Sequence, residues 1–219
     1  MKKVQVLGPF NSGTNLLIKM LVDNCIDLEK PDDKVFVCEN MLMWKHTLRD
    51  YFIKRRAIEN RDHVYIVIHK NIYNWLFSVA INPLDISIPK GLFGKAQMQN
   101  CDYDNLVHLH NRYYKMYKEL LEEFPDQIVA IDYYKLIQKD GLINYLKPKL
   151  EKIRLKFLDE KRALSKLDNP SKNENSVQNS HQALNKYHLV QETMKTTLAS
   201  FPSVADSIDT NLMDHFENL

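Results

Sequence analysis

Short apolar runs alternate with longer helical stretches along this chain of 219 residues. Each short run is rich in β-branched residues and bounded by polar ones, a pattern typical of a buried strand. Strands are predicted on this basis at Val4–Leu7, Lys34–Cys38, His63–Ile68 and Gln127–Ile131.

The stretches between the strands have the period of amphipathic helices. After the first strand, Leu16, Leu17, Met20 and Leu21 share one helical face. Strands alternating with helices predict an α/β fold, in which three layers (α/β/α) enclose a central parallel sheet in a single domain of residues 1–219. Further helices are predicted at Leu48–Asn60, Tyr73–Ala80, Tyr103–Phe124 and Ala183–Ser200, followed by a short polar tail.

Two stretches interrupt this alternation. Asn82–Cys101 contains two prolines and two glycines without a clean period, and we expect it to form a lid over a binding site. Ser165–Gln182 is polar and rich in Asn and Ser, so we expect a flexible segment there.

Composition narrows the classes of protein that fit. The net charge of +2 makes no case for nucleic acid binding. The chain opens without the apolar region of a signal peptide, and no apolar stretch reaches transmembrane length, so we expect a cytoplasmic protein without a membrane span. Cys25, Cys38 and Cys101 are widely spaced and odd in number, which predicts reduced thiols rather than disulfides or a zinc site.

The segment Gly8–Asn15 links the first strand to the first helix and predicts a P-loop-like phosphate-binding loop. Backbone N–H groups in such a loop, together with a helix N-terminus, favour an anion. Gly8 permits a tight turn, Gly13 permits close approach of the backbone, and Ser12 and Thr14 add hydroxyl donors.

The nucleotide-triphosphatase pattern GxxxxGK[ST] is matched only in its glycines. Thr14 stands in place of the lysine and Asn15 in place of the magnesium-binding hydroxyl. The strand His63–Ile68 also lacks a terminal Asp for a metal. A kinase-like phosphotransferase is therefore an alternative that lacks its main charge-neutralising groups, and no metal site is predicted.

A second pair of polar residues follows the strand His63–Ile68. Lys70 stands at the carboxyl end of this strand, where ligands bind in open α/β sheets, and Ser78 lies about two helical turns further on. A cation and a hydroxyl in this arrangement can hold one phosphate from two sides.

Together these segments resemble the PAPS-dependent sulfotransferase family (PAPS is 3′-phosphoadenosine 5′-phosphosulfate). The family has a 5′-phosphosulfate loop of the form PKSGTxxL, and Pro9–Leu17 reads PFNSGTNLL. Its 3′-phosphate motif has the form RNPxDxxxS, and Lys70–Ser78 reads KNIYNWLFS. Ile131–Leu136 is similar to a later YEDL segment, so the resemblance covers roughly residues 4–150.

The resemblance implies binding of PAPS as co-substrate, with PAP as product. It assigns the 3′-phosphate to Lys70 and Ser78. Three family positions differ here: the loop lysine is Asn11, the 3′-phosphate arginine is Lys70, and the adenine-stacking aromatic residue is Leu16. No clear counterpart of the family's C-terminal glycine-rich segment is present. The loop residues assigned to the 5′ side of the nucleotide are Phe10, Asn11, Ser12, Gly13, Thr14 and Asn15.

His46 is the candidate catalytic base, because many family members place a histidine after the second strand, close to a lysine. A neutral imidazole can take the proton of an attacking hydroxyl. Lys45 is predicted to supply the cation that the loop lacks at Asn11. Trp44, Phe10 and the lid would shape the acceptor site, and the Trp-Lys-His sequence resembles that of glycan-directed or uncharacterised microbial relatives. We expect His69, by contrast, to be packed in its strand.

The function predicted from the sequence is therefore metal-independent transfer of a sulfuryl group from PAPS to a hydroxyl of a small-molecule or glycan acceptor. Asn11 leaves open a second alternative, a catalytically weak protein that binds PAPS or PAP.

Overall fold

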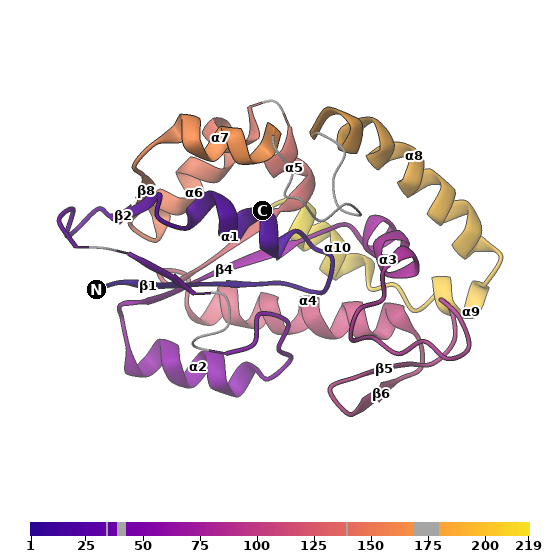
Figure 1. Cartoon of the computed structure of the whole chain (residues 1–219). Coiled ribbons are helices and arrows are strands. Elements are labelled where there is room, and N and C mark those ends of the chain that lie inside the picture. The colour runs from indigo at the N-terminus through magenta and orange to yellow at the C-terminus, as the bar shows by residue number, and fades with distance from the viewer. Residues whose placement is uncertain (34, 39–42, 139, 169–179) are drawn as a thin grey trace.

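A four-stranded parallel sheet forms the centre of the structure (Figure 1). The computed structural model describes residues 1–33, 35–38, 43–138, 140–168 and 180–219. The strands lie in the order β3-β1-β4-β7, and β1 is parallel to both of its neighbours. This confirms the predicted central parallel sheet. The strands are β1 (Lys3–Leu7), β3 (Phe36–Cys38), β4 (His63–His69) and β7 (Ile128–Asp132).

Helices cover both faces of this sheet, as the sequence predicts. Val64, Ile66 and Ile68 of β4 pack in the core on one face, and Tyr65 and Val67 pack in the core on the other. In Figure 1, α1, α6 and α7 lie above the sheet and α2 and α4 below it. The helices of the first half are α1 (Thr14–Leu21), α2 (Asp50–Glu59), α3 (Ile72–Ile81) and α4 (Leu106–Glu123).

The second half of the chain adds short elements that the sequence pattern did not separate. After β7 the chain continues without a break into a helix, and the residues beyond it cover the same face of the sheet as α1. These elements are α5 (Tyr133–Ile137), a π-helical segment η1 (Gly141–Leu146), α6 (Lys147–Lys152), β8 (Leu155–Phe157) and α7 (Glu160–Asp168).

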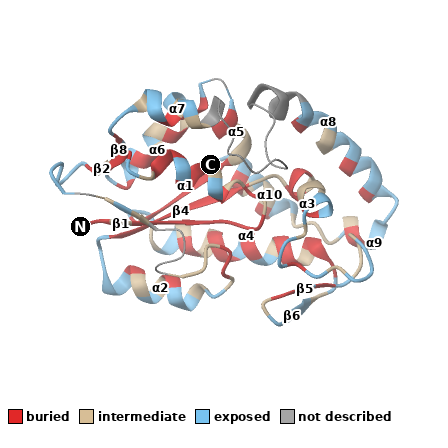
Figure 2. Ribbon diagram, in the orientation of Figure 1, coloured by how far each residue is buried: buried red, intermediate tan, exposed pale blue. Residues whose placement is uncertain are grey.

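The part of the chain predicted as a short polar tail is folded. Beyond α8 (Ser180–Ala199) lie α9 (Pro202–Ala205) and α10 (Thr210–Glu217). Leu212 and Phe216 of α10 are buried in the core, against α4 and β7 (Figure 2). The polar-tail prediction was wrong because two apolar residues one helical turn apart are enough to dock a short helix.

Two stretches predicted as irregular contain regular structure. The predicted lid Asn82–Cys101 includes β5 (Ala96–Met98), which pairs antiparallel with β6 (Cys101–Tyr103). Of the predicted flexible segment Ser165–Gln182, residues 165–168 belong to α7 and 180–182 to α8, and the rest lies outside the described residues.

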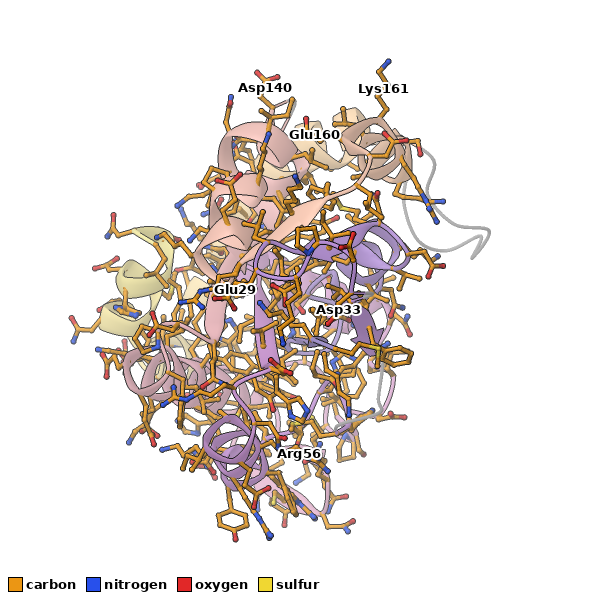
Figure 3. The ribbon with its side chains drawn as sticks, turned by 90° about the vertical axis from the view of Figure 1, so that its left-hand side faces the viewer. Glu29, Asp33, Arg56, Asp140, Glu160 and Lys161 are labelled. Atoms are coloured by element: carbon orange, nitrogen blue, oxygen red, sulfur yellow. The ribbon has the colours of Figure 1, made fainter. Side chains whose placement is uncertain are left out.

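The amino-terminal edge of the sheet lies away from the site that is described below. There β2 (Cys25–Asp27) pairs antiparallel with β8, and the buried ammonium of Lys2 donates to Asp27 Oδ1 at 2.8 Å. Figure 3 faces this edge and shows charged side chains, such as those of Asp140 and Lys161, pointing outward. Among the described residues, no helix has both the length and the apolar character needed to span a bilayer.

Candidate functional site

The loop between β1 and α1 is fixed in place by helix α3. The indole Nε1 of Trp75 donates to the carbonyl oxygen of Phe10 at 2.7 Å. One residue further on, the side-chain amide of Asn11 donates to the carbonyl oxygen of Asn82 at 2.7 Å. The loop is therefore bound at two successive positions to the element that carries Ser78.

Two residues of the loop have a left-handed backbone conformation before the helix begins. Asn11 has φ of 59° and Gly13 has φ of 103°, both in the left-handed region, whereas Ser12 between them has not. Asparagine and glycine are the residues that adopt this region most readily. Gly13 precedes the first residue of α1, and no side chain caps the first turn of that helix.

Position 8 needs a glycine because neighbouring atoms leave no room for a side chain. A Cβ at this position would lie 2.5 Å from both the carbonyl oxygen of Ile68 and Oγ of Ser12. Ser12 itself is fully buried, and its hydroxyl donates to the carbonyl oxygen of Pro9 at 2.7 Å. The Ser12 hydroxyl thus shapes the loop from inside, and its predicted contact with a phosphate stays a prediction.

His46 lies against the start of this loop. Its Nδ1 is 2.7 Å from the carbonyl oxygen of Gly8, and its ring stacks on Phe10 with centroids 4.1 Å apart. Trp44 contacts both of these rings edge-on. Burial, together with the charge of Lys45, lowers the pKa of His46 to about 4. The imidazole is therefore neutral near pH 7.

Lys45 reaches the first turn of α1. Its Nζ donates to Oδ1 of Asn15 at 2.7 Å, and its carbonyl oxygen accepts from the N–H of Gly8 at 3.0 Å. The segment containing Lys45 and His46 is thus bound to the loop by both backbone and side chains.

Lys70 occupies the carboxyl end of β4, next to the same loop. Its Nζ donates to Oγ of Ser78 at 3.2 Å and lies 4.5 Å from the centroid of the Tyr133 ring. Burial lowers the pKa of Lys70 to about 8. Over the parts of the chain that the structure describes, Lys70 forms no ion pair with a carboxylate.

Tyr133 connects Lys70 to the loop. A Cβ at Gly13 would lie 2.5 Å from the Tyr133 ring, so the glycine allows the ring to rest on the loop backbone. The same Tyr133 ring also contacts the ammonium of Lys70. The ring therefore lies between the loop and Lys70, the two places where phosphate binding is predicted.

The predicted lid is attached to the residue proposed as base. The side-chain amide of Gln99, at the turn of the β5–β6 hairpin, donates to the carbonyl oxygen of His46 at 3.1 Å. The hydroxyl of Tyr113 on α4 donates to the same oxygen at 2.8 Å. These two bonds fix the backbone of His46 from the side away from the loop.

The structure gathers all the predicted site residues around one loop. Lys45 and His46 approach it from the segment after β3, and Lys70 and Ser78 approach it from β4 and α3. Sequence reasoning gave no role to the residues that hold this arrangement together, namely Trp75, Gln99, Tyr113, Tyr114 and Tyr133. Trp75 lies within the motif Lys70–Ser78, and a buried indole N–H in need of an acceptor was the available signal.

Three further histidines lie outside the loop and differ in burial. His69 and His110 are buried, and burial lowers the pKa of each to about 3. His108 is partly exposed, and its Nδ1 lies 3.3 Å from Asp104. His69 is packed between the rings of Tyr114 and Phe216, as its strand position predicts.

Within the described residues, no three His, Cys, Asp or Glu side chains gather as metal ligands would. Comparisons of the chain with protein-family models, with curated proteins and with solved structures each found no match.

Proposed function

We propose that this chain binds PAPS at the β1–α1 loop and transfers its sulfuryl group to a hydroxyl of a small-molecule or glycan acceptor. The observation that carries the proposal is the ammonium of Lys70, which is partly buried, bonded to the hydroxyl of Ser78, and without a carboxylate partner among the described residues. A charge that is partly removed from water and has no counter-ion is costly, and an anionic ligand would relieve that cost.

The loop geometry supports an anion at this place. Asn11 and Gly13 have positive φ just before α1, and a loop of this kind at a helix N-terminus can present backbone N–H groups to an anion. The first N–H groups of α1 have no partner within the helix, and the helix dipole adds partial positive charge there. The residues present therefore fit a ligand with a phosphate at each end, as PAPS has.

In this proposal the chain mainly positions groups and supplies fixed charge. PAPS, when bound, supplies an activated sulfuryl group whose S–O bond to the 5′-phosphate breaks with the electron pair leaving on the phosphate oxygen. The loop N–H groups hold the 5′ side, and Lys70 with Ser78 holds the 3′-phosphate. Lys45 places a cation next to Asn15, where negative charge develops as that bond breaks.

His46 acts as the base. Because the carbonyl oxygen of Gly8 can only accept, Nδ1 carries the proton and the lone pair is on Nε2. The Nε2 atom takes the proton of the acceptor hydroxyl while the acceptor oxygen forms its bond to sulfur.

A thermal-shift comparison of PAP with 5′-AMP tests the nucleotide assignment, because the two differ only in the 3′-phosphate. We expect PAP to raise the melting temperature more than 5′-AMP does, and the Lys70→Ala/Ser78→Ala double variant to lose that difference. Lys115→Ala, an exposed lysine on α4, is the matched control. Equal shifts with both nucleotides in the unaltered chain would exclude the 3′-phosphate site. Sulfuryl transfer abolished by EDTA and restored by Mg²⁺ would favour the kinase-like alternative.

A second candidate function is binding of PAP or PAPS without transfer. It is favoured by the side chain of Asn11, whose amide donates to Asn82, the residue just after α3, and is thus used to attach the loop. A 3′-phosphate-dependent shift with PAP, combined with no sulfated product over a broad panel of phenols, sugars and alcohols, would support this candidate over the first.

A further inference from the structure

A cavity of about 260 Å³ lies at the carboxyl end of β4 and β7. Its lining includes His69 and Asp132, which stand directly opposite each other at the last register position of the two strands. Lys70 follows His69, so its side chain projects from the other face of the sheet. The lining contains no residue of the β1–α1 loop and neither Lys70 nor Ser78, so the cavity is separate from the proposed nucleotide site.

Aromatic rings make up much of the wall. Tyr134 and Tyr187 pack with ring centroids 4.5 Å apart, and Tyr114 and Phe216 pack edge-on with centroids 4.7 Å apart. Electron-rich ring faces attract organic cations as well as apolar groups. At this volume the cavity is smaller than the roughly 300–1,000 Å³ of typical ligand pockets, so its ligand must be small.

Two carboxylates at the cavity are bonded to neutral donors. Asp132, which is 8% exposed, accepts from the backbone N–H of Tyr134 at 2.7 Å. Glu217 accepts from the side-chain amide of Asn71 at 2.8 Å. Neither carboxylate forms an ion pair with any residue that the structure describes.

Lys135, which lines the cavity, and Lys149 direct their ammonium groups to main-chain oxygens. The ammonium of Lys135 donates to the carbonyl oxygen of Glu217 at 2.8 Å, and that of Lys149 donates to the main-chain oxygen of Leu219 at 2.9 Å. Their charges act on Asp132 from outside hydrogen-bonding distance. Burial nevertheless raises the pKa of Asp132, so these two lysines do not replace the solvation that the carboxylate loses.

His69 lacks a hydrogen bond that a ligand could supply. The residue is 2% exposed, and its Nε2 has no partner among the described residues. Since the imidazole is neutral near pH 7, one of its two nitrogens is an acceptor. A buried polar atom left without a partner is uncommon and calls for an explanation.

We propose that this cavity binds a small molecule with a primary ammonium group, placed between Asp132 and His69 and enclosed by the tyrosine rings. The ammonium would donate to the carboxylate and to the imidazole, and its alkyl part would lie against Tyr134 and Tyr187. Tyr114 connects the cavity to the other face, because its hydroxyl accepts from the N–H of Lys70 and donates to its carbonyl oxygen. The proposal does not depend on sulfuryl transfer.

Calorimetric titration at pH 7 with n-butylammonium chloride tests the site, with 1-butanol and tetramethylammonium chloride as matched probes. We expect saturable binding of n-butylammonium alone, since butanol lacks the charge and tetramethylammonium lacks N–H donors. Asp132→Asn keeps the acceptor for the N–H of Tyr134 and removes the charge. We expect it to weaken binding by about tenfold or more, because hydrogen bonds to charged groups contribute roughly 1.5–3 kcal/mol.

Asp126→Asn is the control, since Asp126 is an exposed carboxylate just before the other end of β7. If Asp132→Asn has a lowered melting temperature, Glu217→Gln at an exposed position repeats the test with an expected weakening of a few fold. Absence of saturable n-butylammonium binding would overturn the proposal. Equal affinity of the unaltered chain and the Asp132 and Glu217 variants would overturn it too, and so would equal binding of butanol.

Discussion

Nδ1 of His46 lies 2.7 Å from the carbonyl oxygen of Gly8, the first residue after β1. This contact fixes both the position of the imidazole ring and its tautomer, because the carbonyl oxygen requires a donor. The base proposed for the reaction is therefore held by the loop that is proposed to bind its co-substrate.

The first prediction concerns His46 and acid pH. Only the neutral imidazole can act as base, and its pKa is lowered to about 4, so the transfer rate should stay nearly constant from pH 7 to pH 5. Asn at this position can keep a donor for Gly8 but has no basic Nε2. We expect His46→Asn to lose about a hundredfold or more in rate constant while PAP affinity changes little. A rate that already falls by half near pH 6.5 would contradict the assignment.

The second prediction concerns Lys70 and alkaline pH. The free protein loses the charge of Lys70 as pH rises through about 8, whereas a bound phosphate favours the charged form. The affinity for PAP should therefore be constant below pH 8 and decrease above it. Lys70→Arg should bind PAP with no such decrease, because guanidinium stays charged. Titrations from pH 7 to pH 9.5 measure the effect, and parallel curves for the two proteins would remove Lys70 from the site.

The third prediction concerns the stability of the fold in acid. The pKa values of His46, His69 and His110 are lowered in the folded state to about 4, 3 and 3. Between pH 6.5 and about 4 the unfolded chain therefore binds protons that the folded chain does not, and the free energy of unfolding falls as pH falls. Each such histidine contributes about 1.4 kcal/mol per pH unit in this window.

Urea unfolding at pH 7, 6 and 5 measures this slope. His110→Phe should make the slope shallower by the contribution of one histidine. If this variant keeps the slope of the unaltered chain, the acid sensitivity has another source.

The fourth prediction separates Lys45 from the binding of nucleotide. Its ammonium is placed at the first turn of α1, where we propose that it stabilises charge that develops only during transfer. Lys45→Ala should lose about a hundred- to a thousandfold in turnover and keep most of its PAP affinity. Turnover near that of the unaltered chain, measured with saturating PAPS, would show that Lys45 has no part in the reaction.

The fifth prediction concerns the backbone of the loop. Asn11 adopts φ of 59°, a region that costs most residues about 1–2 kcal/mol and costs glycine little. Asn11→Ala and Asn11→Gly both lose the bond to Asn82, so their difference reports the backbone alone. We expect the alanine variant to be less stable than the glycine variant by about 1 kcal/mol in chemical unfolding. Equal stability of the two would show that the loop relaxes to another conformation.

The sequence predicted the sheet well because buried parallel strands have an unmistakable composition. The predicted strand His63–Ile68 differs from β4 by one residue, and Gln127–Ile131 is displaced by one residue from β7. Lys34, where the second strand was predicted to begin, lies outside the described residues, and β3 begins at Phe36.

The short elements could not be predicted because tertiary pairing creates them. Strands β2, β5, β6 and β8 have three residues each, too few to show a period. Helix α10 has few apolar residues and is held by packing against α4 and β7.

The site was predicted in part for a related reason. Lys70 and Ser78 were predicted as a pair from their spacing along the chain, and the structure places them within hydrogen-bonding distance of each other. Residues that hold them, such as Trp75 and Tyr133, act across the fold, and no local pattern predicts which backbone group they meet.

Strand β2 cannot pair with β8 until most of the chain has been synthesised. Cys25 is paired with Phe157, so more than half of the chain separates the two partners. Contacts of such long range form late and slow the folding of a domain. While the ribosome is still making the middle of the protein, residues 25–27 present an unpaired edge to which other chains can add. Strand β2 is thus among the first parts of the chain to be made and among the last to find its partner strand.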